Sequence, residues 1–181
     1  MNSSVKIVCP KCLYSNNHAF MLGFVHKTCI GCRTHEEKNT LNWDQRKNIL
    51  TDLIKPYKTF GNKYDCVVPV IGDAEDYFVI SNILDLGLSP LIVSVNDYFK
   101  NDIGWKNLHN LITYFDLDSI LFNPNLNDYK ELIKTSFRKE THLFLPWLYL
   151  HTAYPVHVAL EYDIPLIVWG QFQPIEQAGK F

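Results

Sequence analysis

The stretch CVVPVIGDAEDY, residues 66–77, decides the fold of this chain. Its first half, 66–71, is short and almost wholly apolar, which is typical of a strand buried on both faces of a sheet. An acidic turn follows and leads into a helical pattern over about 75–86, after which Gly87 is a suitable helix stop. Pro69 is compatible with the strand if a bulge lies there, because proline cannot donate a ladder hydrogen bond. A buried strand that leads directly into a helix predicts the start of an α/β sheet.

The same alternation continues beyond this first strand and helix. Further strands are predicted at about 91–95, 119–122 and 165–169, and further helices around 108–115 and at about 126–139 and 155–162. Apolar strands that alternate with helices predict a doubly wound parallel sheet covered on both faces, an α/β fold. Ligands of such sheets bind beyond the carboxyl ends of the strands, so the turn after residue 71 is the expected site.

Two cysteine pairs lie near the N-terminus, Cys9-x-x-Cys12 and Cys29-x-x-Cys32, separated by 16 residues. Each pair places two thiolates on one tight turn, and two such turns close a tetrahedron around Zn²⁺. A redox dithiol, which is the alternative, does not need two pairs. A zinc ion with four cysteine ligands has no open position for water, so we predict a structural zinc and expect the chemistry elsewhere.

These patterns divide the chain into three parts. Residues 1–38 are predicted to form a zinc-knuckle module, residues 39–62 a connecting helix, and residues 63–181 the α/β domain, which we expect to be incomplete at its C-terminus. The connecting helix is predicted at about 43–57 with Asn42 as its N-cap. Its predicted apolar face consists of Leu50, Leu53, Ile54 and Tyr57.

The composition places the chain among globular proteins and bounds its partners. Hydrophobic residues make up 47% and charged residues 20% of the 181 residues, with a net charge of -2. A protein that binds nucleic acid through its phosphates is usually basic, so we expect no nucleic-acid partner. No apolar run approaches the ~20 residues of a membrane span. The first residues are not followed by an apolar run, so we do not expect a signal peptide. Cys66 is the unpaired cysteine, and a free thiol beside two metal-type pairs favours a reducing cytoplasm.

Several blocks of the chain match one known family. They are CIGCRTHEEK at 29–38, YDCVVPV at 64–70, LGLSPL at 86–91, IGWKNL at 103–108 and IPLIVWG at 164–170. With these blocks the sequence resembles the N-acetyl sugar amidotransferases, which are PP-loop ATP pyrophosphatases of bacterial surface-glycan biosynthesis. The resemblance covers nearly the whole chain. Family members are longer, so the chain resembles their N-terminal half.

The resemblance implies an ATP-dependent enzyme built on the PP-loop, or HUP-like, α/β sheet. ATP with Mg²⁺ adenylates the carbonyl oxygen of a sugar N-acetyl group, and ammonia then displaces AMP to leave an acetamidino group. The implied partners are a glutaminase and a cyclase-like subunit that supply the ammonia. The implied substrate is a nucleotide-linked sugar or a nonulosonic-acid precursor of lipopolysaccharide, capsule or flagellin glycan.

The phosphate loop is where the chain departs from the family. The family motif is Ser-Gly-Gly-x-Asp-Ser, and residues 72–77 align with it but keep only Asp76 in place. If the loop still binds ATP, we expect Asp73 and Asp76 to hold the Mg²⁺ of Mg²⁺-ATP. We also expect the backbone at Gly72 and Ala74 to approach the phosphates. Three carboxylates in this turn repel a pyrophosphate unless Mg²⁺ bridges them. Two interpretations therefore stay open: metal-dependent ATP binding, or an N-cap at Asp73 in a loop that has lost the nucleotide.

The ends of other strands supply further candidates. Ser94 and Asn96, at the end of the second strand, inherit a nucleotide-binding role from the family. Gly170 and Gln171, at the end of the fourth strand, are candidates for contacts with ribose or sugar. His151 and His157 are either acid–base groups near the sugar or ordinary core or surface residues. The predicted function is an ATP-dependent N-acetyl sugar amidotransferase, and the alternative is a catalytically degenerate binding or scaffold subunit of the same pathway.

Overall fold

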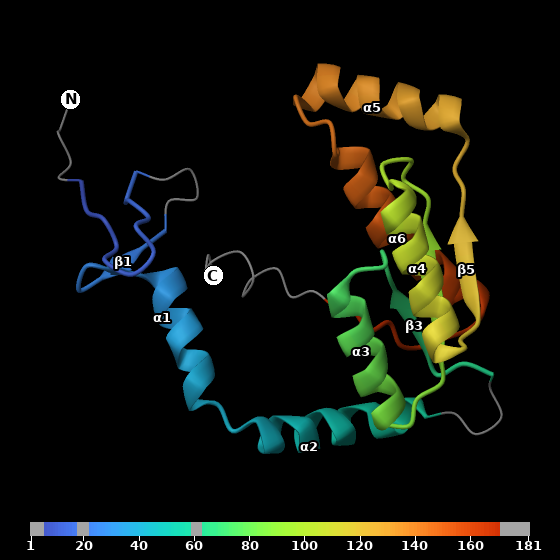
Figure 1. Cartoon of the computed structure of the whole chain (residues 1–181), viewed down its shortest axis with the longest axis horizontal. Helices are drawn as coiled ribbons and strands as arrows, with labels where there is room; N and C mark the ends of the chain where they lie inside the picture. Colours follow the sequence, from blue (N-terminus) through green and yellow to red (C-terminus); the bar gives the residue numbers. More distant parts are fainter. Residues whose placement is uncertain (1–5, 18–21, 59–62, 171–181) are drawn as a thin grey trace. The chain divides into compact units, whose positions relative to one another are not determined.

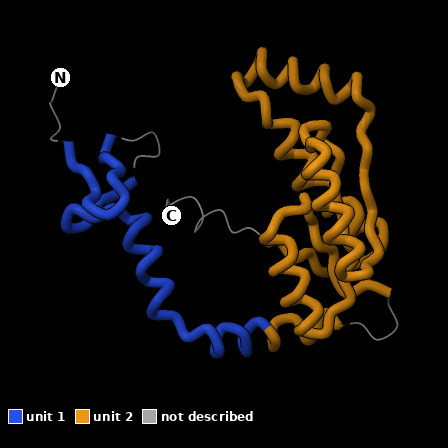
Figure 2. Tube along the Cα trace, in the orientation of Figure 1, with its two compact units in different colours: residues 1–50, 171–181 blue, residues 51–170 orange. Residues whose placement is uncertain are grey.

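The structure is a computed structural model that describes residues 6–17, 22–58 and 63–170 (Figure 1). These residues belong to two compact units, the first reaching to Leu50 and the second spanning Thr51–Gly170 (Figure 2). The domain boundaries proposed from the sequence, after residues 38 and 62, stay a prediction. No helix in the described part of the chain has the length and apolar character needed to cross a membrane.

The first unit is small and contains little regular structure. Its elements are the two-residue strands β1 (Phe24–Val25) and β2 (Thr28–Cys29), the helix α1 (Ile30–Glu37) and the 3-10 turn η1 (Lys38–Thr40). The two strands pair antiparallel. Among the described residues of this unit, the buried apolar side chains are Cys9, Leu22 and Cys29. The unit therefore has almost no apolar core apart from its cysteines.

The helix α2 (Trp43–Ile54) continues into the 3-10 turn η2 (Lys55–Tyr57). Its predicted cap is confirmed, because the backbone N–H of Gln45 donates to Oδ1 of Asn42 at 3.0 Å. Of the four residues in the predicted apolar face only Ile54 is buried, and Leu53 is 63% exposed. Ile54 is buried because it belongs to the apolar cluster on one face of the sheet in the second unit.

The second unit is built on a parallel three-stranded sheet in the order β3-β4-β5. Its strands are β3 (Cys66–Pro69), β4 (Pro90–Val95) and β5 (Ser119–Phe122), and its helices are α3 (Ala74–Asp85), α4 (Asp102–Phe115), α5 (Leu126–Glu140) and α6 (Leu145–Glu161). Three of the four predicted strands are thus confirmed, as are the first three predicted helices of this unit. Gly87, with a φ of 73°, lies in the left-handed region just after α3, as its role as a helix stop requires.

Both faces of this sheet are covered, as unbroken apolar strands require. One face packs against α3 and α4, which run side by side in Figure 1, and the shared cluster includes Val68, Ile92, Ile80 and Leu111. The other face packs against α6, and that cluster includes Val67, Leu91 and Val158. The predicted doubly wound α/β architecture is therefore confirmed.

Pro69 lies in the regular register of β3, and the expected bulge is absent. Residues Cys66–Pro69 pair one to one with Pro90–Val93. The N–H of Val67 donates away from β4, to the carbonyl of Leu166 at 2.9 Å. Amide directions alternate along a strand, so the nitrogen of Pro69 also faces away from β4. The missing donor therefore costs the β3–β4 ladder no hydrogen bond.

The fourth predicted strand, 165–169, is replaced by a single parallel bridge between Val67 and Ile167. The N–H of Val168 donates to the carbonyl of Val67 at 2.9 Å and begins a parallel ladder. The next bond of that ladder would need an N–H at Pro69, which has none. The proline thus stops the pairing after one residue, and the prediction of a full strand is wrong.

The helix α6 begins at Leu145, well before residue 155, where the sequence predicts its start. Pro146 lies in its first turn, where a missing N–H has no helical partner to lose. Pro155 lies inside the helix and is buried, and its missing N–H leaves the carbonyl of His151 without an intrahelical donor. The helix continues through this gap because residues beyond it, such as Val158, pack against the sheet.

The carboxyl end of β3 is the switch point of this fold. The helices α3 and α4 cover one face of the sheet, and α6 carries the chain over the other face to the bridge at Ile167. Open α/β sheets bind ligands in the crevice at such a point. The loop after β3 is therefore where we expect a ligand.

Candidate functional site at the carboxyl edge of the sheet

The loop after β3 folds around the carboxylate of Asp76. Oδ2 of Asp76 accepts hydrogen bonds from the backbone N–H groups of Ile71 at 2.9 Å, Gly72 at 2.7 Å and Asp73 at 3.2 Å. In return, Oδ1 of Asp73 accepts from the N–H of Asp76 at 3.1 Å, which completes a capping box for α3. Three converging amides at a helix N-terminus form an anion cradle. In this structure the anion in the cradle is a carboxylate of the chain itself.

Asp76 is held in this cradle at an electrostatic cost. Burial raises the pKa of Asp76, and the negative charge of Asp73 acts in the same direction. The hydrogen bonds from Gly72 and Ile71 act to lower it, and burial prevails. The Asp73 side chain is the predicted N-cap, so the capping interpretation of this loop describes the conformation seen.

Gly72 is required by packing as well as by backbone conformation. Its φ is 94°, in the region that favours glycine, and a Cβ there would lie 2.8 Å from both Cα and N of Leu108 on α4. Helix α4 therefore lies directly against the loop. A serine at this position would therefore not fit.

Replacing Gly72 with alanine is expected to lower the free energy of unfolding by about 2–3 kcal/mol, because backbone strain adds to a clash with main-chain atoms. Urea denaturation checks this. Gly104 in α4 is the matched control, since a Cβ there has no neighbour nearer than 3.5 Å. A Gly72→Ala protein as stable as Gly104→Ala would contradict the packing argument.

Ser94 and Ala74 lie close to this loop. The Oγ of Ser94 is buried and donates to the carbonyl of Val70, the last residue before the cradle, at 2.8 Å. Ser94 thus ties the end of β4 to the end of β3. Ala74 is the first residue of α3. A nucleotide-binding role for either residue stays a proposal.

Asn96 and Gly170 lie farther from the cradle. Nδ2 of Asn96 donates to Oδ1 of Asn123 at 2.9 Å, so Asn96 links the ends of β4 and β5. Gly170 approaches α3, where a Cβ would lie 2.9 Å from Cγ2 of Val79. Gln171 lies outside the described residues.

The sequence reasoning missed a polar cluster centred on Asp97, directly beyond β4. Its carboxylate is buried and accepts from four donors: Trp147 Nε1 at 2.8 Å, Phe99 N at 2.9 Å, His151 Nε2 at 3.2 Å and Lys100 Nζ at 3.5 Å. Burial is the largest influence on the pKa of Asp97 and acts to raise it. The donors, with His151 first among them, outweigh burial and hold the pKa of Asp97 well below its usual range. The spacing of Trp147 and His151, one helical turn apart, was the available signal.

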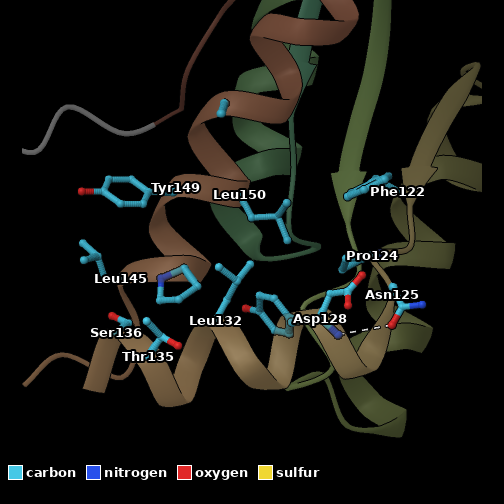
Figure 3. Close-up of a pocket in the computed structure, with 13 residues that line it drawn as sticks. Phe122, Pro124, Asn125, Asp128, Leu132, Thr135, Ser136, Leu145, Tyr149 and Leu150 are labelled. Atoms are coloured by element: carbon cyan, nitrogen blue, oxygen red, sulfur yellow. Dashed lines mark hydrogen bonds between the residues drawn. The ribbon is translucent and has the colours of Figure 1, made fainter. Parts of the chain in front are cut away.

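A cavity of about 610 Å³ opens at the carboxyl end of β5 (Figure 3). Leu132 and Thr135 line it from α5, and Leu150 and Tyr149 line it from α6. The lining surface is almost entirely carbon. None of the predicted site residues within the described part of the chain lines it, so the polar site and this apolar cavity are separate features.

The four cysteines of the first unit are gathered into one cluster. Their Sγ atoms all lie within 4.8 Å of one another, so the cluster can hold a metal ion. The sulfur atoms of Cys9 and Cys32 are 3.8 Å apart, and those of Cys12 and Cys29 are 3.4 Å apart. Tetrahedral sulfur ligands at the usual Zn–S distance lie about 3.8 Å apart, so the donor set fits zinc.

The surroundings shift the pKa values of these thiols in different directions. The N–H of Cys29 is the main influence that lowers the pKa of Cys9, to about 6. Burial raises the pKa of Cys29 and that of Cys32. A bound dication keeps all its sulfur ligands deprotonated and removes their mutual repulsion. Such a site has no free coordination position, so its contribution is structural.

The sequence matches no family model and no curated protein. Among solved structures, the chain is similar to an NMN synthetase from Francisella tularensis, with a TM-score of 0.51 and 12% identity over 70% of this chain and 53% of that one. An NH3-dependent NAD synthetase from Campylobacter jejuni gives a TM-score of 0.48 and 10% identity over 70% of this chain and 56% of that one.

At this level of identity the likeness to the NMN synthetase shows the fold alone. The chain spans about half the length of either structure. The fold is the α/β sheet that the sequence predicts, arranged as in the NMN synthetase and here combined with a cysteine cluster. The likeness does not single out the N-acetyl sugar amidotransferases.

Proposed function

We propose that this chain is an ATP-dependent N-acetyl sugar amidotransferase of bacterial surface-glycan biosynthesis. The observation that carries the proposal is the cradle of three amides from Ile71, Gly72 and Asp73. It lies at the N-terminus of α3 and at the switch point of a synthetase-like sheet, where an anionic ligand gains most from backbone donors. The sequence resemblance supplies the substrate class.

In this proposal a nucleotide phosphate displaces the carboxylate of Asp76 from the cradle. The freed Asp76 and the neighbouring Asp73 then hold the Mg²⁺ that neutralises the acidic turn. The carbonyl oxygen of the sugar N-acetyl group attacks the α-phosphate of ATP, and pyrophosphate leaves as the adenylate forms. Ammonia from a glutaminase and a cyclase-like subunit then displaces AMP. The cysteine cluster holds a structural zinc and takes no part in the chemistry.

One observation favours a second candidate function, a non-catalytic binding or scaffold subunit of the same pathway. The cradle is already filled by the carboxylate of Asp76, which satisfies all three amide donors. A loop that is complete without a ligand suits a protein that keeps the fold to dock a partner such as the glutaminase.

Calorimetric titration of the zinc-loaded chain with Mg-ATP separates the two functions. The enzyme proposal expects saturable heat at millimolar nucleotide or below. It also expects Asp73→Asn to weaken binding at least about tenfold, or about 1.4 kcal/mol, because a ligand of the bridging Mg²⁺ is lost. Glu75→Gln is the matched control, since it removes an exposed charge from the same turn and leaves the cap intact. No heat from the wild-type protein would reject the enzyme and retain the binding subunit.

A further inference from the structure

Two aromatic residues on α6 converge on the buried carboxylate of Asp97. Trp147 and His151 lie four residues apart, and their ring centroids are 4.6 Å apart. Both rings direct a nitrogen at the same oxygen, Oδ2 of Asp97, at 2.8 and 3.2 Å. A histidine held by a carboxylate on one side and a ring on the other has a fixed orientation.

The surroundings of Asp97 determine which nitrogen of His151 carries the proton. Asp97 also accepts from the backbone N–H of Phe99 and from Lys100, whose ammonium group donates to the carbonyl of Val95 at 3.1 Å as well. With an ionised acceptor at Oδ2, the Nε2 atom of His151 must be the donor. The lone pair of the neutral ring therefore lies on Nδ1.

Nδ1 of His151 takes part in no hydrogen bond among the described residues, where the ring bonds through Nε2. The fully buried side-chain atom that lacks a partner in this part of the chain is the hydroxyl of Tyr129. Nδ1 of His151 is therefore not fully buried. The ring as a whole is only 13% exposed. The nearly buried ring thus keeps one nitrogen without a hydrogen-bond partner.

The cluster lies on the same edge of the sheet as the phosphate cradle. Asp97 follows β4, and Lys100 contacts the last residue of that strand, Val95. The neighbouring Ser94 is bonded to Val70, directly before the cradle. A continuous path of bonded groups therefore runs along the carboxyl edge from the cradle to His151.

We propose that Nδ1 of His151 is a proton acceptor for an amine nucleophile at this edge, with Asp97 and Trp147 as positioning residues. The inference rests on the proposed function and names the acid–base residue of its second step. The nitrogen of ammonia forms the new C–N bond, the C–O bond to the adenylate breaks, and AMP leaves with that electron pair. One proton of the attacking nitrogen passes to Nδ1, and the resulting imidazolium is stabilised by Asp97.

Diethyl pyrocarbonate tests the open lone pair without any nucleotide or sugar. The reagent transfers its ethoxycarbonyl group to an unprotonated imidazole nitrogen, forming an N–C bond and breaking the anhydride C–O bond. Mass spectrometry of the digested full chain then compares His151 with His157, whose side chain is 70% exposed. We expect His151 to be labelled within about tenfold of the rate of His157, and Asp97→Asn to slow its labelling several-fold. An unlabelled His151 beside a fully labelled His157 would overturn the proposal.

His151→Gln separates this inference from the proposed function. Glutamine keeps a donor for Asp97, so we expect the heat of Mg-ATP binding to be unchanged. We also expect ammonia-dependent AMP release, with UDP-N-acetylglucosamine as the probe sugar, to fall at least a hundredfold. Tenfold weaker nucleotide binding in the variant would assign a binding role instead and overturn the inference. If the wild-type chain binds no nucleotide, the proposed function fails, and the labelling result alone decides the assignment of His151.

Discussion

We expect the cysteine cluster to hold zinc, and we expect its removal, by chelation or by Cys29→Ser, to unfold the first unit and leave the second unit folded. In the described part of the first unit, Leu22 is the one buried apolar residue that is not a cysteine. A structural zinc site contributes about 10–16 kcal/mol, far more than such a core can replace. The second unit has its own apolar clusters on both faces of the sheet.

Hydrogen exchange read by mass spectrometry, together with metal content, checks this expectation. Exchange should become fast over residues 22–37 and stay slow over the strands at 66–69 and 90–95. Cys66→Ser is the matched control, because Cys66 is buried in the sheet and burial raises its pKa to about 12, which disfavours a metal-binding thiolate. A Cys29→Ser protein with one bound zinc and unchanged exchange would contradict a structural metal.

Asp97→Ala is expected to destabilise the second unit by about 3–5 kcal/mol, because removing one member of a buried charged cluster leaves the others unpaired. The ammonium of Lys100 is nearly buried and would lose its counterion. Urea denaturation at neutral pH measures the effect. Asp102, exposed in the first turn of α4, is the control, and its replacement by alanine should cost no more than about 1 kcal/mol. Equal losses for the two variants would show that the Asp97 cluster contributes no special stability.

The same cluster predicts how stability depends on pH. The pKa of Asp97 is lowered in the folded protein, so the ionised carboxylate stabilises the fold. That contribution is complete above the unfolded pKa of about 3.9 and is lost as pH falls through the lower folded value. The stability difference between wild type and Asp97→Asn should therefore shrink as the pH falls below about 4.

The strands and most helices of the second unit could be predicted because apolar runs and turn residues carry the information locally. The run 91–95 and Gly87 needed no knowledge of the rest of the chain. The prediction of the fourth strand failed because this segment pairs with β3. There Pro69, which lies far away in sequence, lacks the N–H that the next ladder hydrogen bond needs. The predicted start of α6 was wrong because Pro155 is tolerated inside a helix that packs against the sheet.

In the loop after β3, the helix cap was predictable from the sequence and the other contacts were not. The place of Asp73 at the start of a helix predicts a cap, and the structure has one. No local pattern shows that the Asp76 carboxylate turns back onto three amides, since this depends on the loop geometry that Gly72 and α4 impose. The cluster of Asp97 and His151 joins residues more than fifty positions apart, and only the fold brings them together.

The account as a whole depends on a nucleotide replacing the Asp76 carboxylate at the end of β3. Resonances of the amide groups of Ile71, Gly72 and Asp73, followed by NMR during the Mg-ATP titration, test this directly. We expect these three amides to shift together and saturably, at the affinity found by calorimetry. Saturable binding that leaves all three unmoved, or no shift at millimolar nucleotide, would contradict a phosphate site in this cradle.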